Sequence, residues 1–453
     1  MSRNRQQTVR QEIRIVMNSY QINKSASSLL LLTALLISAC GSSKEPLSDL
    51  TSAPPQIQST NSDQAPTLAA AQLDPYSLPL ASIEDFEFIG GFRIPAEQYA
   101  GTSFNYAKGV IEQSGNSLFI VGHEHHDMIA EFAIPELVNS EVISELIMAD
   151  DPIQLPVSVL GASSSGNSQS IDDITGLEVI NNRLIINAKE YYDAPADNSH
   201  TTLIADNAFG LASSEIGGYY ELRGAAHAGG WLSPIPAEWQ AVLGGDYMTG
   251  YSSGDPIISR LSVGPSAFVV KSTEFSRVNA GDRDIRTTKL MDFSLRRPLH
   301  EDLFNESRNN DLWTHTSNAV YGFIVPGTRT YATFGHTSGI TSGVGYKVTQ
   351  DDGSLCPGYC SNLKADQSNY YWLWDVKDLA SVKQRRKISS SIKPYAYGKF
   401  DVPYQTNGTI NRIGGASFDE ATGTLLFSVL MADTEQGEFT NPPVIAGYQL
   451  NLR

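Results

Sequence analysis

Short apolar runs alternate with polar turn residues over most of the chain, from about Ile83 to Arg453. Short runs bounded by Gly, Asn, Asp and Ser are typical of β-strands. Three segments repeat a pattern of strand, tight polar turn and second strand, namely residues 115–121, 176–186 and 416–428. Gly and Asn in such turns supply the positive φ that two-residue hairpins require.

A further strand follows several of these hairpins, at residues 129–135, 371–376 and 445–450. No long helical period is present, although Asp378 to Arg386 fits one short helix. Many short strands in a degenerate repeat predict an all-β fold, a β-propeller. The 371 residues from 83 to 453 (453 − 82 = 371) predict seven blades at roughly 45–50 residues each, or eight as the second choice. A large pair of β-sandwiches is the alternative.

The N-terminal segment has the pattern of an export signal. Lys24 precedes an apolar core from Leu29 to Ile37, and small residues then lead to Cys40 and Gly41. A basic region, a short apolar core and small residues before a cleavage point indicate a signal peptide. The cysteine makes this segment resemble bacterial lipoprotein signals, with residues 1–39 removed and Cys40 lipidated. Gly41 in place of Asp favours the outer membrane, and Met17 is an alternative start.

Residues 41–80 are rich in Ser, Thr, Pro, Gln and Ala, with almost no aromatic residues. This composition cannot bury a core and predicts a flexible tether. We therefore divide the chain into a signal peptide at 1–39, a lipidated cysteine with tether at 40–82, and a propeller domain at 83–453.

The chain is strongly acidic, with a formal net charge of −17. The signal carries five Lys/Arg and one Glu, so the mature chain has −17 − 4 = −21. This balance argues against a nucleic-acid partner, because phosphate binding needs a basic face. A polyanionic substrate would require a local basic groove set against the overall field.

Three of the eight histidines, His123, His125 and His126, follow the apolar run 118–122. Loops at strand ends carry function in β-rich folds, and histidine can act as base, acid or ligand near neutral pH. The alternative is a solvated loop.

A second stretch, residues 189–266, concentrates aromatic, glycine and single basic residues, a mixture that suits sugar sites. It contains Tyr192, His200, Tyr247 and Arg260, together with Arg223.

With Cys40 assigned to the lipid, two thiols remain, Cys356 and Cys360. Together with His336 and His315 they form a plausible tetrahedral zinc set. The alternative is a disulfide, which exported proteins favour. The sequence leaves both open.

Several segments resemble the seven-bladed β-propeller polysaccharide lyases that degrade ulvan, a sulfated algal polysaccharide. They are residues 117–123, 130–135, 235–240, 262–266 and 374–379. The resemblance implies β-elimination at a uronic acid, with His123 and Arg260 as the best-matched residues and Tyr192, Tyr247 and His200 as further acid–base candidates. It also implies a structural zinc on His336, Cys356, Cys360 and His315.

We therefore expect an exported, lipid-anchored polysaccharide lyase, monomeric, acting on an acidic, uronate-containing glycan. Its membrane contact would be through the lipid anchor alone. Two rivals are a non-catalytic glycan-binding propeller and a protein-binding propeller scaffold of the cell envelope.

Overall fold

The apolar runs form antiparallel strands that pair mainly with their sequence neighbours, and these strands build five blades of a β-propeller. The computed structural model describes residues 74–163, 166–254, 257, 260–279, 284–405 and 410–452, which belong to one unit of the chain. The predicted signal peptide, Cys40 and the tether up to residue 73 lie outside the described residues.

Four antiparallel strands form the core of each blade. In blades 1 to 4 they follow chain order from the propeller axis outward. Blade 1 holds β2 (Ile111–Ser114), β3 (Ser117–Val121), β4 (Met128–Ala133) and β5 (Gln154–Ser158). Blade 2 holds β6 (Asp173–Ile180), β7 (Arg183–Lys189), β8 (Thr202–Ala205) and β9 (Ile216–Leu222), to which β13 (Asp284–Ile285) adds in parallel. Blade 3 holds β10 (Trp231–Pro234), β11 (Tyr247–Gly250), β12 (Ala267–Val270) and β14 (Thr287–Met291). Blade 4 holds β15 (Asn318–Ile324), β16 (Thr330–Ser338), β19 (Gln367–Asp375) and β20 (Ala396–Lys399).

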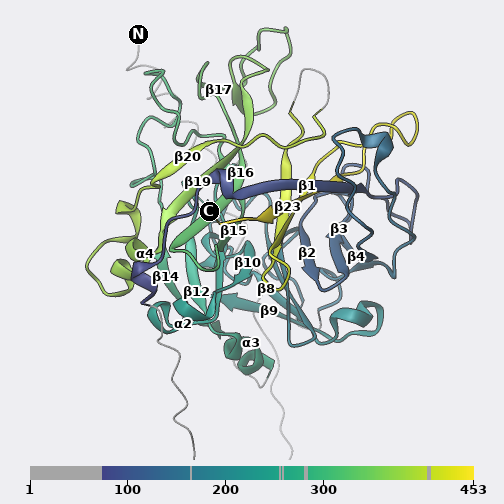
Figure 1. Ribbon diagram of the computed structural model, residues 1–453, viewed down its shortest axis with the longest axis horizontal. Helices are drawn as coiled ribbons and strands as arrows, with labels where there is room; N and C mark the ends of the chain where they lie inside the picture. The colour runs from purple at the N-terminus through teal and green to yellow at the C-terminus, as the bar shows by residue number, and fades with distance from the viewer. Residues whose placement is uncertain are drawn as a thin grey trace, which may run out of the picture. The chain divides into compact units, whose positions relative to one another are not determined.

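Blade 5 joins the two ends of the domain. Its strands β21 (Ile413–Asp419), β22 (Thr424–Val429) and β23 (Val444–Leu450) come from the C-terminal end, and β1 (Phe86–Arg93) comes from the N-terminal end. Figure 1 shows the purple β1 running beside the yellow β23. The inner strands β2, β6, β10, β15 and β21 contact one another in a closed ring. The pairing of the N-terminal strand with the C-terminal strands in one blade closes the propeller.

The prediction of a β-propeller is confirmed, but the prediction of seven blades is wrong, since the structure has five. The error came from the assumed length per blade. Long connections take up the missing residues, such as 292–317 between blades 3 and 4. Another is 339–366, which carries the hairpin β17 (Val344–Tyr346) and β18 (Tyr359–Ser361). The three predicted hairpins are confirmed as β2–β3, β6–β7 and β21–β22.

Among the described residues, the helices are short and lie in the connections. They are α2 (Ala237–Leu243), α3 (Ser272–Asn279) and α4 (Val376–Lys383), with 3-10 turns at Pro75–Ser77, Ile83–Asp85, Ile143–Glu145, Ala208–Ser213, Ala225–His227 and Ser389–Ser391. The predicted helix at 378–386 corresponds to α4. Asp375 caps its N-terminus by accepting a hydrogen bond from the Lys377 backbone N–H at 3.0 Å, which satisfies one of the free donors there.

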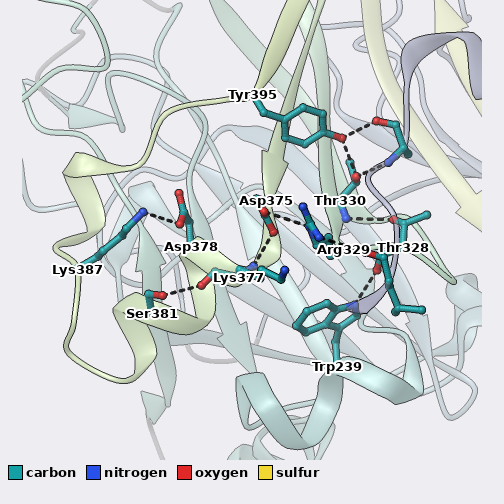
Figure 2. Close-up of polar contacts among 12 residues, drawn as sticks. Trp239, Thr328, Arg329, Thr330, Asp375, Lys377, Asp378, Ser381, Lys387 and Tyr395 are labelled. Atoms are coloured by element: carbon teal, nitrogen blue, oxygen red, sulfur yellow. Dashed lines mark hydrogen bonds and ion pairs between the residues drawn. The ribbon is translucent and has the colours of Figure 1, made fainter. Parts of the chain in front are cut away.

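Residues 74–82, which were predicted to belong to the tether, pack against blades 3 and 4. Ala81 donates its backbone N–H to the Thr330 hydroxyl at 2.8 Å and accepts from the Tyr395 hydroxyl at 2.6 Å. Figure 2 shows the labelled Thr330 and Tyr395 converging on this segment. The Tyr76 ring meets Trp239 edge to face at 5.7 Å. The docked chain therefore begins before residue 83.

The face at which the inner strands begin is also the face at which each second strand ends. The register pairs Ile111 with Ile120, Asp173 with Lys189, and Asn318 with His336. Trp231 and Gly250 pair in the same way in blade 3. We call this side of the propeller the cavity face. Glycine allows the inner strands to approach closely there, because a Cβ at Gly176 would overlap the Gly230 carbonyl.

Two carboxyl groups lie buried between the inner strands. Glu112 on β2 accepts hydrogen bonds from the Val179 backbone N–H of β6 and the Ser417 hydroxyl of β21. Burial raises the pKa of Glu112 to about 8. Burial, reinforced by Glu112, raises the pKa of Glu178 well above its usual value. The propeller axis therefore holds two carboxyl groups that favour the protonated form.

We expect the free energy of unfolding to fall as pH rises from about 4.5 towards 8, because the unfolded chain releases protons that the folded protein keeps. At about 1.4 kcal/mol per pKa unit the loss amounts to several kcal/mol. Glu178→Gln removes one of the two titrations and should reduce this alkaline loss by about half. Urea unfolding at several pH values measures it, with the exposed Glu136→Gln as control. A pH dependence identical in both variants would contradict the assignment.

Candidate active site

A cavity of about 230 Å³ lies on the cavity face where the starts of the inner strands meet. Its polar lining consists of Lys108, Glu124, Thr175, Tyr251, Asn318, His336 and Arg412. These side chains come from all five blades or from the loops that flank their strands. The fold, rather than one sequence motif, therefore brings these polar groups together.

An ion-pair network supports one wall of the cavity. The carboxylate of Asp173, at the start of β6, contacts the Lys108 ammonium at 2.5 Å and the Lys189 ammonium at 3.0 Å. The Lys189 ammonium also lies over the rings of Tyr191 and Tyr251, at 5.5 and 5.6 Å from their centroids. The Lys108 and Lys189 ammonium groups therefore share the carboxylate of Asp173 beside the cavity.

Asp127 lies behind this wall, at the end of the loop that carries the histidine cluster. Its Oδ2 accepts from the Ile174 backbone N–H at 3.4 Å. Burial, with the nearby Asp173 carboxylate, raises the pKa of Asp127 to about 7, although Lys108 opposes the shift. Neither Asp127 nor Asp173 is among the residues that line the cavity, so both act on it through Lys108.

Arg412 is held in place by a side chain of blade 4. Asn369 accepts from the Ile413 backbone N–H at 3.0 Å and donates to the Asn411 carbonyl at 3.0 Å, so it binds the backbone on both sides of Arg412. The Arg412 guanidinium donates to the Gln367 amide oxygen at 2.9 Å. Partial desolvation by the surrounding protein lowers the pKa of Arg412. The side chain is still exposed to solvent on the side that lines the cavity.

His336 lies near the end of β16, directly opposite Asn318 on β15. Burial, together with the positive charge of Arg412, lowers the pKa of His336 well below its usual value, so the ring is neutral at neutral pH. Its Nδ1 is buried and has no hydrogen-bond partner among the described residues. The Asn318 amide oxygen accepts from the Ser252 hydroxyl at 3.0 Å, which leaves its amide nitrogen as the group for a ligand. His336, Asn318 and Arg412 thus offer a neutral base and two donors.

The structure places the predicted His123 on the cavity face, but at its rim. The His123 Nδ1 accepts from the His125 backbone N–H at 3.1 Å. Its ring lies 6.0 Å from that of Tyr106 and 5.0 Å from that of His126. Burial and the two neighbouring histidines lower the pKa of His123. Glu124, the next residue, is the member of this loop that lines the cavity.

The other predicted acid–base residues are not brought together. Tyr192 is exposed on the loop after β7, and His200 lines a separate cavity on blade 2 with Tyr219 and Tyr220. The Arg260 guanidinium donates to the Asp193 and Ala194 carbonyls at 2.8 and 2.9 Å, so it holds the loop that bears Tyr192. Tyr247 begins β11 at the end opposite to the cavity face.

The structure resolves the choice at the two cysteines in favour of a disulfide. Cys356 and Cys360 are bonded, with their Cα atoms 6.4 Å apart. A disulfide sulfur cannot act as a thiolate ligand, so the predicted zinc set loses two of its four members. His315 stacks on Tyr359 at 3.8 Å between ring centroids, whereas His336 lines the central cavity. Across the described ranges, one triad brings possible metal ligands together, the carboxylates Glu190, Asp193 and Asp197, which are not a zinc-type set.

Sequence reasoning missed Lys108, Tyr251, Asn318 and Arg412 as site residues. Each lies within three residues before an inner strand, begins an inner strand or directly follows a second strand. In a propeller these positions converge at one end of the axis, and this rule could have found them once the strands were placed. His336 was singled out, but for a metal rather than for the cavity.

No protein-family model and no curated protein matches the chain. Among solved structures, it is similar to a protein from Bacteroides thetaiotaomicron provisionally described as a glycosidase. The TM-score is 0.36 at 8% identity, over 81% of this chain and 97% of that one. A protein from Parabacteroides distasonis, provisionally described as a glycoside hydrolase, gives 0.34 at 8%, over 84% and 98%. One called GH43_12 from a capybara gut metagenome gives 0.35 at 9%, over 80% and 53%. These values are too low to carry an argument on activity. In the part of the chain that the structure describes, no helix is long and apolar enough to cross a membrane.

Proposed function

We propose that the protein is a carbohydrate-active enzyme that cleaves a uronate-containing glycan by β-elimination in the central cavity. The observation that carries the proposal is a histidine with a lowered pKa that lines the cavity together with an arginine, where the lining has one carboxylate. Lys108 and Arg412 supply the local positive charge that an acidic chain needs to bind an anionic sugar.

β-Elimination requires a proton to leave the carbon next to the uronate carboxylate. That proton is weakly acidic until the carboxylate charge is neutralised, because negative charge spreads onto the carboxylate as the proton leaves. The Arg412 guanidinium and the Asn318 amide nitrogen are assigned this task. They act as donors that strengthen as the enolate-like charge develops.

His336 is assigned as the base that removes the C5 proton. Its low pKa keeps it unprotonated, and a bound carboxylate would raise that pKa towards the operating pH, where proton abstraction is most efficient. The phenol of Tyr251 is assigned as the acid. As the C5–H bond breaks, a C4–C5 double bond forms, the C4–O bond breaks, and Tyr251 protonates the leaving oxygen.

A hydrolase is the second candidate, favoured by the raised pKa of Asp127, which is suited to a general acid. Glycoside hydrolysis normally needs two carboxyl groups that reach the scissile bond. Of the nearby carboxyl groups, Glu124 lines the cavity, while Asp127 and Asp173 lie behind its wall. The arrangement therefore favours elimination.

Incubation of the protein with ulvan and other uronate glycans tests the proposal. We expect ultraviolet absorbance from the C4–C5 double bond to rise in step with new reducing ends. New reducing ends without absorbance would replace the lyase with the hydrolase. Glycan affinity without either product would indicate a binding propeller, and no affinity for any glycan would indicate a protein-binding scaffold.

A further inference from the structure

We propose that a basic patch beside α4 binds an anionic phospholipid surface next to the point where the chain arrives from its predicted lipid anchor. The basic patch consists of Arg296, Arg297, Lys383, Arg385, Arg386, Lys387 and Lys393, with the apolar Leu295 and Ile388. It lies away from the central cavity and takes no part in the proposed cleavage.

Two segments far apart in the sequence build the patch. Arg296 and Arg297 line an open hollow of about 690 Å³ together with Ile388 and Lys393. The Lys393 ammonium donates to the Leu299 carbonyl, which ties the two segments together. Their cations therefore form one surface rather than two separate clusters.

The seven cations of the patch outnumber the acidic groups beside them, which are Glu301 in the same hollow and Asp378. Among the described residues, the guanidinium groups of Arg296, Arg297, Arg385 and Arg386 make no ion pair. Lys387 pairs with Asp378 at 2.5 Å, as Figure 2 shows. In a chain of net charge −17, such a concentration of unpaired cations marks a surface for a polyanion.

Apolar side chains distinguish a lipid surface from a soluble polyanion. Leu295 is 49% exposed and Ile388 is 56% exposed, both among the cations. Basic residues attract acidic headgroups, and aliphatic side chains gain by entering the boundary between headgroups and acyl chains. A charged polysaccharide would offer no partner for the two aliphatic groups.

The N-terminal segment arrives at the same place. Gln384 donates to the Tyr76 hydroxyl at 3.2 Å, and the Tyr76 ring packs on Trp239. From Cys40 to Asp74 there are 34 residues (74 − 40 = 34), so a lipid on Cys40 can lie at most about 120 Å along the chain from Asp74. A lipid on Cys40 would therefore keep the patch within reach of the membrane and raise its effective concentration there.

This placement also suits the cavity. Asp375, which ends β19 and caps α4, pairs with Thr330 at the end of blade 4 opposite to His336. Membrane contact at α4 would leave the cavity face open to a polymeric substrate. Basic residues near an acidic membrane surface would add an electrostatic contact to the lipid anchor.

Vesicle sedimentation tests the patch apart from the lipid. The protein is the chain from residue 40 onward with Cys40→Ser, and the vesicles are phosphatidylcholine with or without phosphatidylglycerol. We expect salt-sensitive binding to the phosphatidylglycerol vesicles alone. The triple variant Arg385→Gln/Arg386→Gln/Lys387→Gln should bind about 100-fold more weakly, at roughly fivefold for each charge removed.

The matched control is Arg286→Gln/Lys347→Gln/Lys399→Gln, which removes three exposed cations elsewhere. It should bind like the parent protein. Equal binding by both triple variants would overturn the proposal. Loss of polygalacturonate affinity in the patch variant, with no vesicle binding by the parent, would also overturn it and assign a glycan surface instead. Glycan cleavage should be the same in both variants, so the result is independent of the proposed function.

Discussion

His336→Asn is expected to lower turnover of a uronate glycan by about 10²–10⁴-fold, the usual contribution of a general base. Asparagine keeps a polar group of similar reach but cannot accept the C5 proton. The ring lies near the end of β16 in the cavity wall, and its buried Nδ1 has no partner among the described residues, so no internal hydrogen bond there is lost. The ultraviolet assay measures turnover, and thermal unfolding checks that the fold is intact.

His123→Asn is the matched comparison, because the sequence alone favours His123 as the reactive histidine. His123 lies at the rim among Tyr106, His125 and His126, and we expect its replacement to change turnover by less than tenfold. The reverse result, with activity lost in His123→Asn and kept in His336→Asn, would return the chemistry to the histidine cluster.

Local patterning predicted the strands well, since hairpins depend on residues close in sequence. The turns at Gly115 and at Asn181–Asn182 have the positive φ values expected of them. The number of blades depends instead on how much chain lies between strands. The connection at 292–317 and the β17–β18 insertion carry no strand of a blade, so division by an average blade length gave seven instead of five.

The site was harder to predict for a related reason. His123, His125 and His126 are conspicuous because they are adjacent in sequence, whereas the cavity gathers residues as distant as Lys108 and Arg412. Arg412 itself has no local signal. Its position depends on Asn369, a residue of another blade that binds the backbone on either side of it.

Composition alone does not decide whether the two cysteines bind zinc or form a disulfide. Two thiols four residues apart suit either zinc or a disulfide, and the choice depends on whether histidines lie close enough to complete a tetrahedron. The structure directs His336 to the cavity and stacks His315 on Tyr359, while Cys356 bonds to Cys360. The spacing of the histidines and cysteines in the sequence does not indicate that His336 and His315 lie apart from the two cysteines in the fold.

Arg412→Gln is expected to lower kcat/KM by about 10²–10³-fold, because the charge that neutralises the developing enolate is lost. Asn369 binds the backbone of Asn411 and Ile413, on either side of the substituted residue, and these hydrogen bonds remain in the variant. The strand should therefore keep its position. Arg260→Gln is the matched control. Its guanidinium contacts the Asp193 and Ala194 carbonyls, so its loss should affect the loop more than the chemistry.

A second measurement separates a role in charge neutralisation from a purely structural one. The positive charge of Arg412 is one cause of the low pKa of His336, so Arg412→Gln should raise that pKa towards the ordinary value for histidine. The acidic limb of the pH–rate profile, which falls as His336 takes up a proton, should then move to higher pH. Arg260→Gln should leave the limb in place. An unshifted limb together with wild-type kcat/KM in Arg412→Gln would show that the two side chains do not share one site.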